Sequence, residues 1–157
     1  MIYLVTGQRA LFESEAYKVI SVEESLRLLN PLTIVGLDTE TEGLDPWTKG
    51  LKSIQLGNYE FQIVIDTTTI SPLVYKEYLE SDRLFIGWNL KFDLKFLFRH
   101  NIVPKQVWDG YLAEKLMWLG YPPGIHSLSL KSAGENYLNI ELDKSVRGKI
   151  IYAGLTE

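Results

Sequence analysis

Carboxylates gather directly after an apolar run in the stretch IVGLDTETEGLDP, residues 34–46. Asp38 and Glu40 end the run, and Glu42 and Asp45 follow closely. Because side chains alternate along a strand, Asp38 and Glu40 point to the same side, with Cα atoms about 6.6 Å apart. Two carboxylates at that spacing can converge on hard cations such as Mg²⁺ or Mn²⁺. The alternative is an exposed strand end followed by a polar turn.

A third acid, Asp93, stands within GWNLKFDLKFLFRH, residues 87–100, which has the pattern of an amphipathic helix. It falls on the edge of an apolar face made by Leu90, Leu94, Leu97 and Phe98. A separate basic stripe, typical of a solvated face, contains Lys91, Lys95 and Arg99. Without a local basic partner, Asp93 should be protonated, hydrogen-bonded or coordinated, unless its carboxylate reaches water.

Asp38, Glu40 and Asp93 are therefore three candidate ligands on a strand end and a helix. Two metal ions about 3.5–4 Å apart can activate a water and stabilise the leaving oxygen of a phosphodiester. Carboxylates suit this chemistry because they hold the ions while leaving positions open for phosphate and water. The pattern predicts a cluster of the three acids.

The elements that must position these acids indicate an α/β fold with a mixed sheet. Short strands are expected at 2–5 and 17–20, as an N-terminal hairpin, and further strands at 33–38, 51–56, 61–65 and 84–88. Helices are expected at 22–29 after an N-cap at Ser21, from Pro72 to Leu79, at 90–100, after an N-cap at Asp109, and at 127–138.

The composition is that of an ordinary globular protein, with 157 residues, 46% hydrophobic, and a formal net charge of −4. We expect a single domain over 1–157, with 1–16 as an N-terminal extension. The absence of cysteine excludes disulfides and thiolate zinc sites. The sequence shows neither a membrane-spanning run nor a secretory signal, so no membrane partner and a cytoplasmic location, in a bacterial or phage-infected cell, are expected.

The two acidic segments resemble the motifs of a known family. DTETEGLD (38–45) and NLKFDLKFL (89–97) resemble the first and second motifs of the DEDD 3′-5′ exonucleases, most closely the proofreading domain of family-A, DNA polymerase I-like enzymes. Ribonuclease D-like exonucleases are near relatives. The resemblance extends over Tyr17 to Glu157 and includes YKVISVEESLRLL, WDGYLAEKLM and HSLSLKSAGENYLNIELDKSVR.

The resemblance implies a ribonuclease H-like fold, a mixed central sheet flanked by helices, and two-metal hydrolysis of DNA from a single-stranded 3′ end. It implies that Asp38 and Glu40 are direct metal ligands and that Asp93 holds the second metal. Three further residues have implied contacts with the substrate strand: Thr41, Leu44 and Asn89. It also implies an attached or associated polymerase domain.

The family's third motif, a Tyr followed four residues later by an Asp on a late helix, is not found at its usual place. Tyr152 is followed by Thr156, and Tyr137 by Glu141 in a segment resembling a connector. We therefore expect a fragment that lacks one helix, with an incomplete metal site and low activity by itself. A ribonuclease D-like enzyme that trims RNA 3′ ends, and a non-catalytic domain that binds 3′ ends or acts as a scaffold, remain alternatives.

Overall fold

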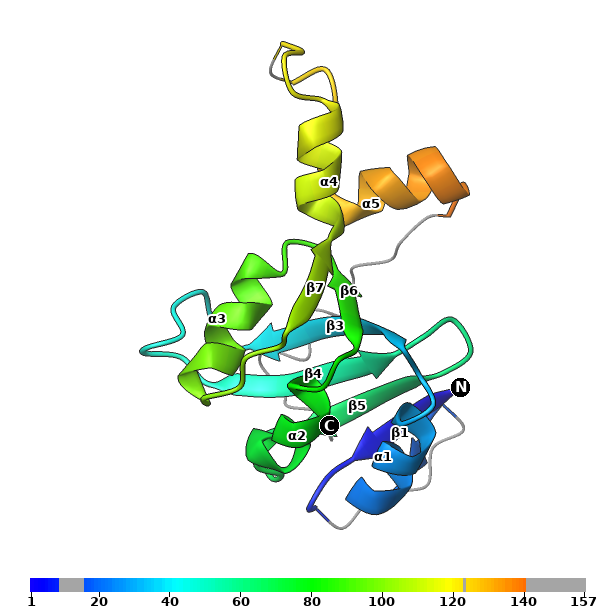
Figure 1. Ribbon diagram of the computed structural model, residues 1–157, viewed down its shortest axis with the longest axis vertical. Coiled ribbons are helices and arrows are strands. Elements are labelled where there is room, and N and C mark those ends of the chain that lie inside the picture. The colour runs from blue at the N-terminus through cyan, green and yellow to red at the C-terminus, as the bar shows by residue number, and fades with distance from the viewer. Residues whose placement is uncertain (9–15, 123, 141–157) are drawn as a thin grey trace.

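The computed structural model describes residues 1–8, 16–122 and 124–140 and contains a seven-stranded mixed sheet (Figure 1). The strand order is β2-β1-β5-β4-β3-β6-β7. Strand β4 is antiparallel to both of its neighbours, β3 and β5, while all other neighbouring strands are parallel. The predicted α/β class with a mixed sheet flanked by helices is confirmed.

The strands are β1 (Ile2–Val5), β2 (Lys18–Val19), β3 (Ile34–Thr41), β4 (Leu51–Gly57), β5 (Gln62–Asp66), β6 (Leu84–Gly87) and β7 (Gln106–Asp109). The helices are α1 (Val22–Leu29), α2 (Lys76–Leu79), α3 (Lys91–Arg99), α4 (Gly110–Met117) and α5 (Leu130–Ala133). A 3₁₀ turn, η1 (Pro72–Tyr75), precedes α2, and a π-helical turn, η2 (Gly134–Leu138), follows α5.

Local sequence explains several element boundaries. The Ser21 hydroxyl accepts a hydrogen bond from the Glu24 backbone N–H, which caps α1 as predicted. The carboxylate of Asp109 likewise caps α4 by accepting from the Tyr111 N–H at 3.0 Å. Both caps satisfy N–H groups that a helix cannot pair internally. His100 is the C-cap of α3.

Two predicted features need correction, and one strand was not predicted. Strands β1 and β2 pair in parallel, so they do not form a hairpin, which requires antiparallel strands. Strand β7 was not predicted, because its four residues are half-exposed or exposed and lack an apolar run. The helix predicted over 127–138 starts only at Leu130 and divides into α5 and η2.

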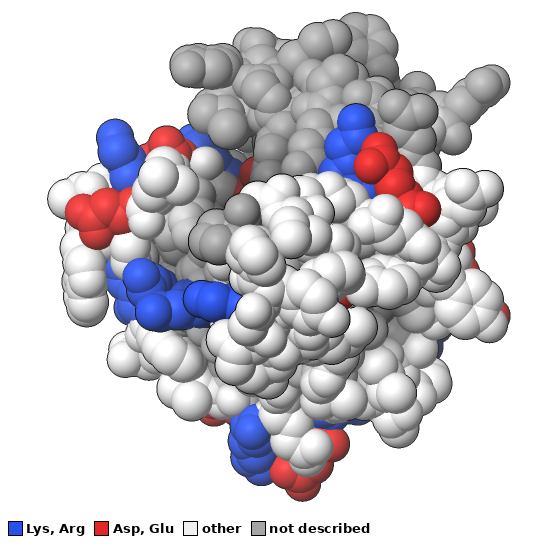
Figure 2. All heavy atoms as spheres, turned by 90° about the horizontal axis from the view of Figure 1, so that it is seen from above, with Lys and Arg blue, Asp and Glu red and all other residues white. Residues whose placement is uncertain are grey.

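The core lies between the sheet and the helices packed on it, and its fully buried members include Val35, Ile54, Ile65, Phe85, Leu97 and Ile102. Helix α4 projects from the end of β7, away from this core (Figure 1). Leu112 and Leu116 on this helix, and Leu119 just after it, are largely exposed. Figure 2 shows the molecule from the end at which α4 projects, and the side chains at the centre of this view are mainly uncharged. Among the described residues, no helix is long and apolar enough to cross a membrane.

Candidate active site

Strand β3 places the first two acids. It lies between β4 and β6 and runs to Thr41, three residues further than predicted, so Asp38 and Glu40 both belong to the strand. Their side chains are half-buried and share one face, while Thr39 and Thr41 are buried on the other. The pairing with β4 shifts register between Glu40 and Thr41, an irregularity that bends a strand and redirects its side chains.

The two acids that follow β3 stabilise the loop instead. Glu42 forms an ion pair with Lys52 at 2.8 Å and accepts from the Gly50 N–H, and these contacts lower the pKa of its carboxyl. Asp45 accepts from the Trp47 N–H and the Thr48 hydroxyl, which lowers its pKa as well. The acidic stretch therefore divides into two acids within strand β3, Asp38 and Glu40, and two acids that stabilise the following loop, Glu42 and Asp45.

Helix α3 supplies the third acid. Asp93 is only 3% exposed, which confirms its predicted position at the edge of the apolar face. Its Oδ1 accepts a hydrogen bond from the Thr39 hydroxyl at 2.6 Å, across 54 residues of sequence. The two motifs thus meet through a side chain that the sequence analysis did not single out. In the sequence, the only indication of this contact is that Thr39, a hydroxyl residue, stands between Asp38 and Glu40.

Burial dominates the electrostatics of Asp93. Loss of solvent, together with a smaller effect of the Asp38 charge, raises the pKa of its carboxyl to about 6, even though the Thr39 hydrogen bond acts to lower it. Among the described residues, no Lys, Arg or His forms an ion pair with Asp93. Near neutral pH, the site therefore contains a buried negative charge beside a second one.

The predicted cluster of three acids is not formed by the side chains as they stand. Within residues 1–8, 16–122 and 124–140, no three His, Cys, Asp or Glu side chains are grouped so that they could hold a metal ion. Asp93 and Asp38 interact electrostatically, but one oxygen of Asp93 is bonded to Thr39. The Thr39 hydroxyl donates a hydrogen bond to the Asp93 carboxylate, whereas a second carboxylate at the same distance would repel the charge of Asp93.

The donor chemistry nevertheless fits a hard divalent cation. The strand and helix acids provide oxygen ligands, the kind that Mg²⁺ and Mn²⁺ prefer. A buried carboxylate without a basic partner is costly, and a cation between Asp38 and Asp93 would offset that cost.

The start of α3 is fixed by contacts around Asn89. This residue has a left-handed backbone with φ of 61°, and its N–H donates to Asp109 at 2.8 Å. Asp109 was predicted only as the cap of α4, but the same oxygen also fixes the turn that leads into α3. The preceding Trp88 ring packs on Gly110, where an added Cβ would come within 2.7 Å of the ring.

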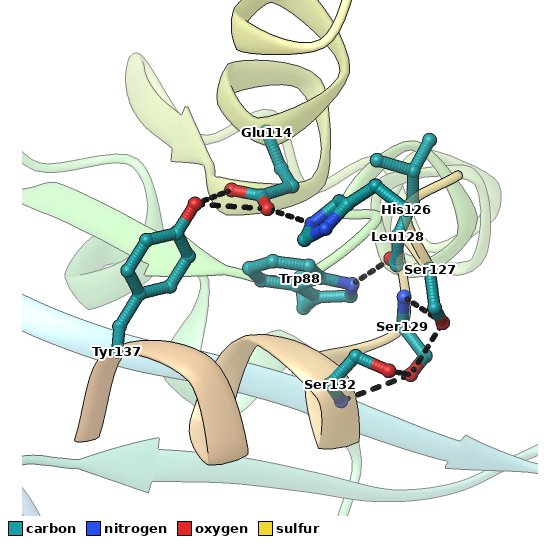
Figure 3. A network of polar contacts seen from close by, with 8 residues as sticks. All are labelled: Trp88, Glu114, His126, Ser127, Leu128, Ser129, Ser132 and Tyr137. Carbon is teal, nitrogen blue, oxygen red and sulfur yellow. Dashed lines mark hydrogen bonds and ion pairs between the residues drawn. The ribbon is translucent and has the colours of Figure 1, made fainter. Parts of the chain in front are cut away.

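A polar network connects this turn to the C-terminal elements (Figure 3). The Trp88 indole N–H donates to the Leu128 carbonyl at 3.1 Å. Glu114, on α4 and only 5% exposed, contacts His126 and accepts from the Tyr137 hydroxyl at 3.0 Å. His126 therefore has a structural partner, and the Tyr137 hydroxyl is engaged with Glu114.

The predicted substrate-contacting residues lie around the same strand end. Leu44 is 84% exposed in the loop after β3, and Asn89 is exposed before α3. Thr41 is buried, and its hydroxyl donates to the Gly43 carbonyl at 2.8 Å. Tyr152 and Thr156, which bear on the third motif, lie outside the described residues.

Comparisons with known proteins identify the family of this chain. The sequence model of the 3′-5′ exonuclease family found in DNA polymerase A matches residues 16–149. DNA polymerase I of Aquifex aeolicus is 32% identical over 124 residues, 79% of this chain. The chain spans only 20% of the length of that polymerase.

Solved structures show the same fold. Brucella melitensis NrnC with bound Mg²⁺ has a TM-score of 0.66 and 21% identity, covering 99% of this chain and 74% of its own. Escherichia coli RNase D, an exoribonuclease, has a TM-score of 0.64 and 22% identity, covering 78% of this chain and 32% of its own. The ribonuclease H-like fold is thereby confirmed. On the strength of its sequence match, the chain belongs to the family of 3′-5′ exonuclease domains of the DNA polymerase I type.

Proposed function

We propose that this domain hydrolyses phosphodiester bonds at the 3′ end of single-stranded DNA, with Asp38, Glu40 and Asp93 as ligands of Mg²⁺ or Mn²⁺. Family members generally depend on divalent metals, and the Brucella NrnC structure contains Mg²⁺. The observation that most supports the proposal is the buried Asp93 beside Asp38, without a basic partner among the described residues. DNA is favoured over RNA by the 32% identity to a DNA polymerase.

The chain's own residues would orient the reaction. Asp38 and Glu40, on one face of β3, would be the metal ligands from the strand, and Asp93 would be the metal ligand from α3. Bound there, the metal ions would activate a water and stabilise the leaving 3′ oxygen. Thr39 would fix the Asp93 carboxylate and help to keep it ionised, because its hydrogen bond lowers the pKa.

Three residues would position the strand. We propose that exposed Leu44 packs against the terminal bases and that Asn89 lies near the backbone of the strand being cut. The backbone at Thr41 would contact the terminal nucleotide. The cytoplasm as the site of action, and an attached or associated polymerase domain, belong to the same proposal.

The test is degradation of a 5′-labelled single-stranded DNA with Mn²⁺ or Mg²⁺. We expect shortening from the 3′ end that EDTA and Asp38→Ala both abolish. Asp82→Ala is the matched control, because Asp82 is an exposed acid paired with Lys105 at 3.1 Å. Mn²⁺ binding, measured by calorimetry, should also weaken in Asp38→Ala and not in Asp82→Ala.

The same assay distinguishes the alternatives. An RNA of identical sequence that is degraded faster than the DNA would favour the ribonuclease D-like activity, since the 2′-hydroxyl lets a site tell the two apart. Metal-independent binding of 3′ ends without cleavage would favour the non-catalytic role. Failure to bind Mn²⁺ together with failure to cleave would contradict the metal-ligand proposal.

A further inference from the structure

A cavity of about 310 Å³ lies beside the loop that follows β3, separate from the three acids. Its walls come from residues 47–51, from Thr67, and from Arg99 and His100 at the end of α3. We call it the Trp47 pocket. Figure 1 shows this loop next to α3, in keeping with the hydrogen bond between Arg99 and Trp47. All of its lining residues belong to the described part of the chain.

The Trp47 pocket is basic. It contains the side chains of Lys49 and Arg99, and among the described residues neither forms an ion pair. The nearby acids Asp45 and Glu42 feel the charges of Arg99 and Lys49, but each already has other partners: Asp45 accepts from the Trp47 N–H and the Thr48 hydroxyl, and Glu42 pairs with Lys52. Two cations that border one cavity without an acid in its lining favour an anionic ligand.

An aromatic surface completes the pocket. Trp47 is 74% exposed, and Arg99 fixes it by donating to its carbonyl at 2.9 Å, with the guanidinium carbon 5.8 Å from the ring centroid. Arg99 uses one of its five N–H donors in this contact, so the others can reach a phosphate. Exposed aromatic rings beside basic groups are typical of single-stranded nucleic acid sites, where bases stack on them.

We propose that the Trp47 pocket binds one nucleotide unit, with the phosphate at Lys49 and Arg99 and the base against Trp47. Its source would be an internal nucleotide of the strand being shortened, an assignment that rests on the proposed function. The pocket suits this role because its wall residue Leu51 pairs with Thr41, next to Glu40. Residue 44, the proposed contact for the terminal bases, lies in the same loop.

Strand binding can be measured without cleavage by using Asp38→Ala as the background, in EDTA. The probes are an octathymidylate and thymidine 5′-monophosphate, titrated by fluorescence anisotropy and calorimetry. We expect Lys49→Gln and Arg99→Gln each to weaken octamer binding about fivefold to tenfold and to reduce its salt dependence by about one contact. Trp47→Leu should weaken it about tenfold.

Matched controls are Lys105→Gln, an exposed lysine elsewhere, and Trp108→Leu, an exposed tryptophan on β7. Both should bind the octamer within about twofold of the background protein. Thermal melts identify any variant that is unfolded, and the two cation variants provide independent tests because both side chains border the pocket from different elements. If Lys49→Gln, Arg99→Gln and Trp47→Leu bind like the controls, the proposal is wrong.

The two probes separate the sources of the nucleotide. If the pocket substitutions weaken binding of the octamer and not of thymidine 5′-monophosphate, the pocket binds an internal nucleotide of a strand. If they weaken binding of both probes equally, the pocket binds a free nucleotide. The outcome is independent of the catalytic proposal, since loss of octamer binding in pocket variants can be seen whether or not the Asp38-containing protein cleaves. If the Asp38→Ala protein does not bind the octamer, the proposal that the pocket binds a nucleotide of the strand is wrong.

Discussion

The carboxyl group of Asp93 is buried next to a second acid and is bonded to one neutral hydroxyl, that of Thr39. Because the folded protein disfavours its ionised form, Asp93 binds a proton more readily in the native state than in the unfolded state. Its contribution therefore reduces the free energy of unfolding as the pH rises from about 4 to about 6, and the cost is fully present above pH 6.

Replacing Asp93 by Asn should remove that cost. In EDTA at pH 7, we expect Asp93→Asn to be more stable than the parent by about 1–3 kcal/mol, because the amide carries no buried charge and its oxygen can still accept from Thr39. Urea unfolding should show this difference shrinking from pH 6 to pH 4. A difference that stays constant with pH would contradict the electrostatic origin; Asp82→Asn is the control.

Thr39 should control the protonation of Asp93. Thr39→Val keeps the shape of the side chain but removes the donor, so the pKa of Asp93 should rise by about one unit. The acidic limb of the pH profile for DNA cleavage should move upward by the same amount. Thr33→Val, at an exposed position before β3, should leave the profile unchanged. An unchanged profile in Thr39→Val would exclude this role.

At the scale of elements, the junction between β6, α3, β7 and α4 depends on one turn. Asn89 adopts a left-handed backbone there, and Asp109 binds its N–H while capping α4. Asn tolerates this conformation, and glycine adopts it without steric cost. The backbone requirement at position 89 can therefore be separated from the proposed contact with the DNA strand.

The Asn89→Gly variant tests that separation. Its free energy of unfolding should stay within about 1 kcal/mol of the parent, while octamer binding in the Asp38→Ala background should weaken because the amide is lost. Asn89→Val should instead destabilise the fold by about 1–2 kcal/mol, since a β-branched residue is strained at this φ. Unchanged octamer binding by the Gly variant would show that the side chain does not contact the strand.

For the molecule as a whole, Glu114 links α4 to the segment that follows it. Its buried carboxylate contacts His126 and accepts from Tyr137, so three stretches of chain meet at one acid (Figure 3). Because α4 projects from the sheet and its outer face is exposed, few apolar contacts hold this part of the molecule. We expect it to open independently of the core.

Removing the Tyr137 hydroxyl should make that opening more frequent. In Tyr137→Phe, hydrogen exchange of residues 130–138 should be about fivefold faster than in the parent, because Glu114 loses a hydrogen-bond partner. Exchange in α3 should not change. Tyr59→Phe, at a residue that is 94% exposed, is the control. Equal acceleration in α3 would mean that this segment unfolds together with the core.

The sequence by itself determined the features that depend on neighbouring residues: the cap of α1 at Ser21, the apolar strand ending in Asp38 and Glu40, and the face of α3 that buries Asp93. The α/β class followed from these patterns, whereas the family was indicated by the resemblance of the two acidic segments to known motifs and was confirmed by comparison with known proteins. Periodicity and capping are local, so the chain's fold is not needed to see them.

The tertiary structure decided which distant residues meet. The bond between Thr39 and Asp93, the double role of Asp109, the Glu114 network and the Trp47 pocket all join residues from separate elements. Strand β7 likewise exists because β6 offers it an edge to pair with, not because its residues have a strand pattern. Such contacts depend on the path of the whole chain, and the pattern of neighbouring residues does not specify that path.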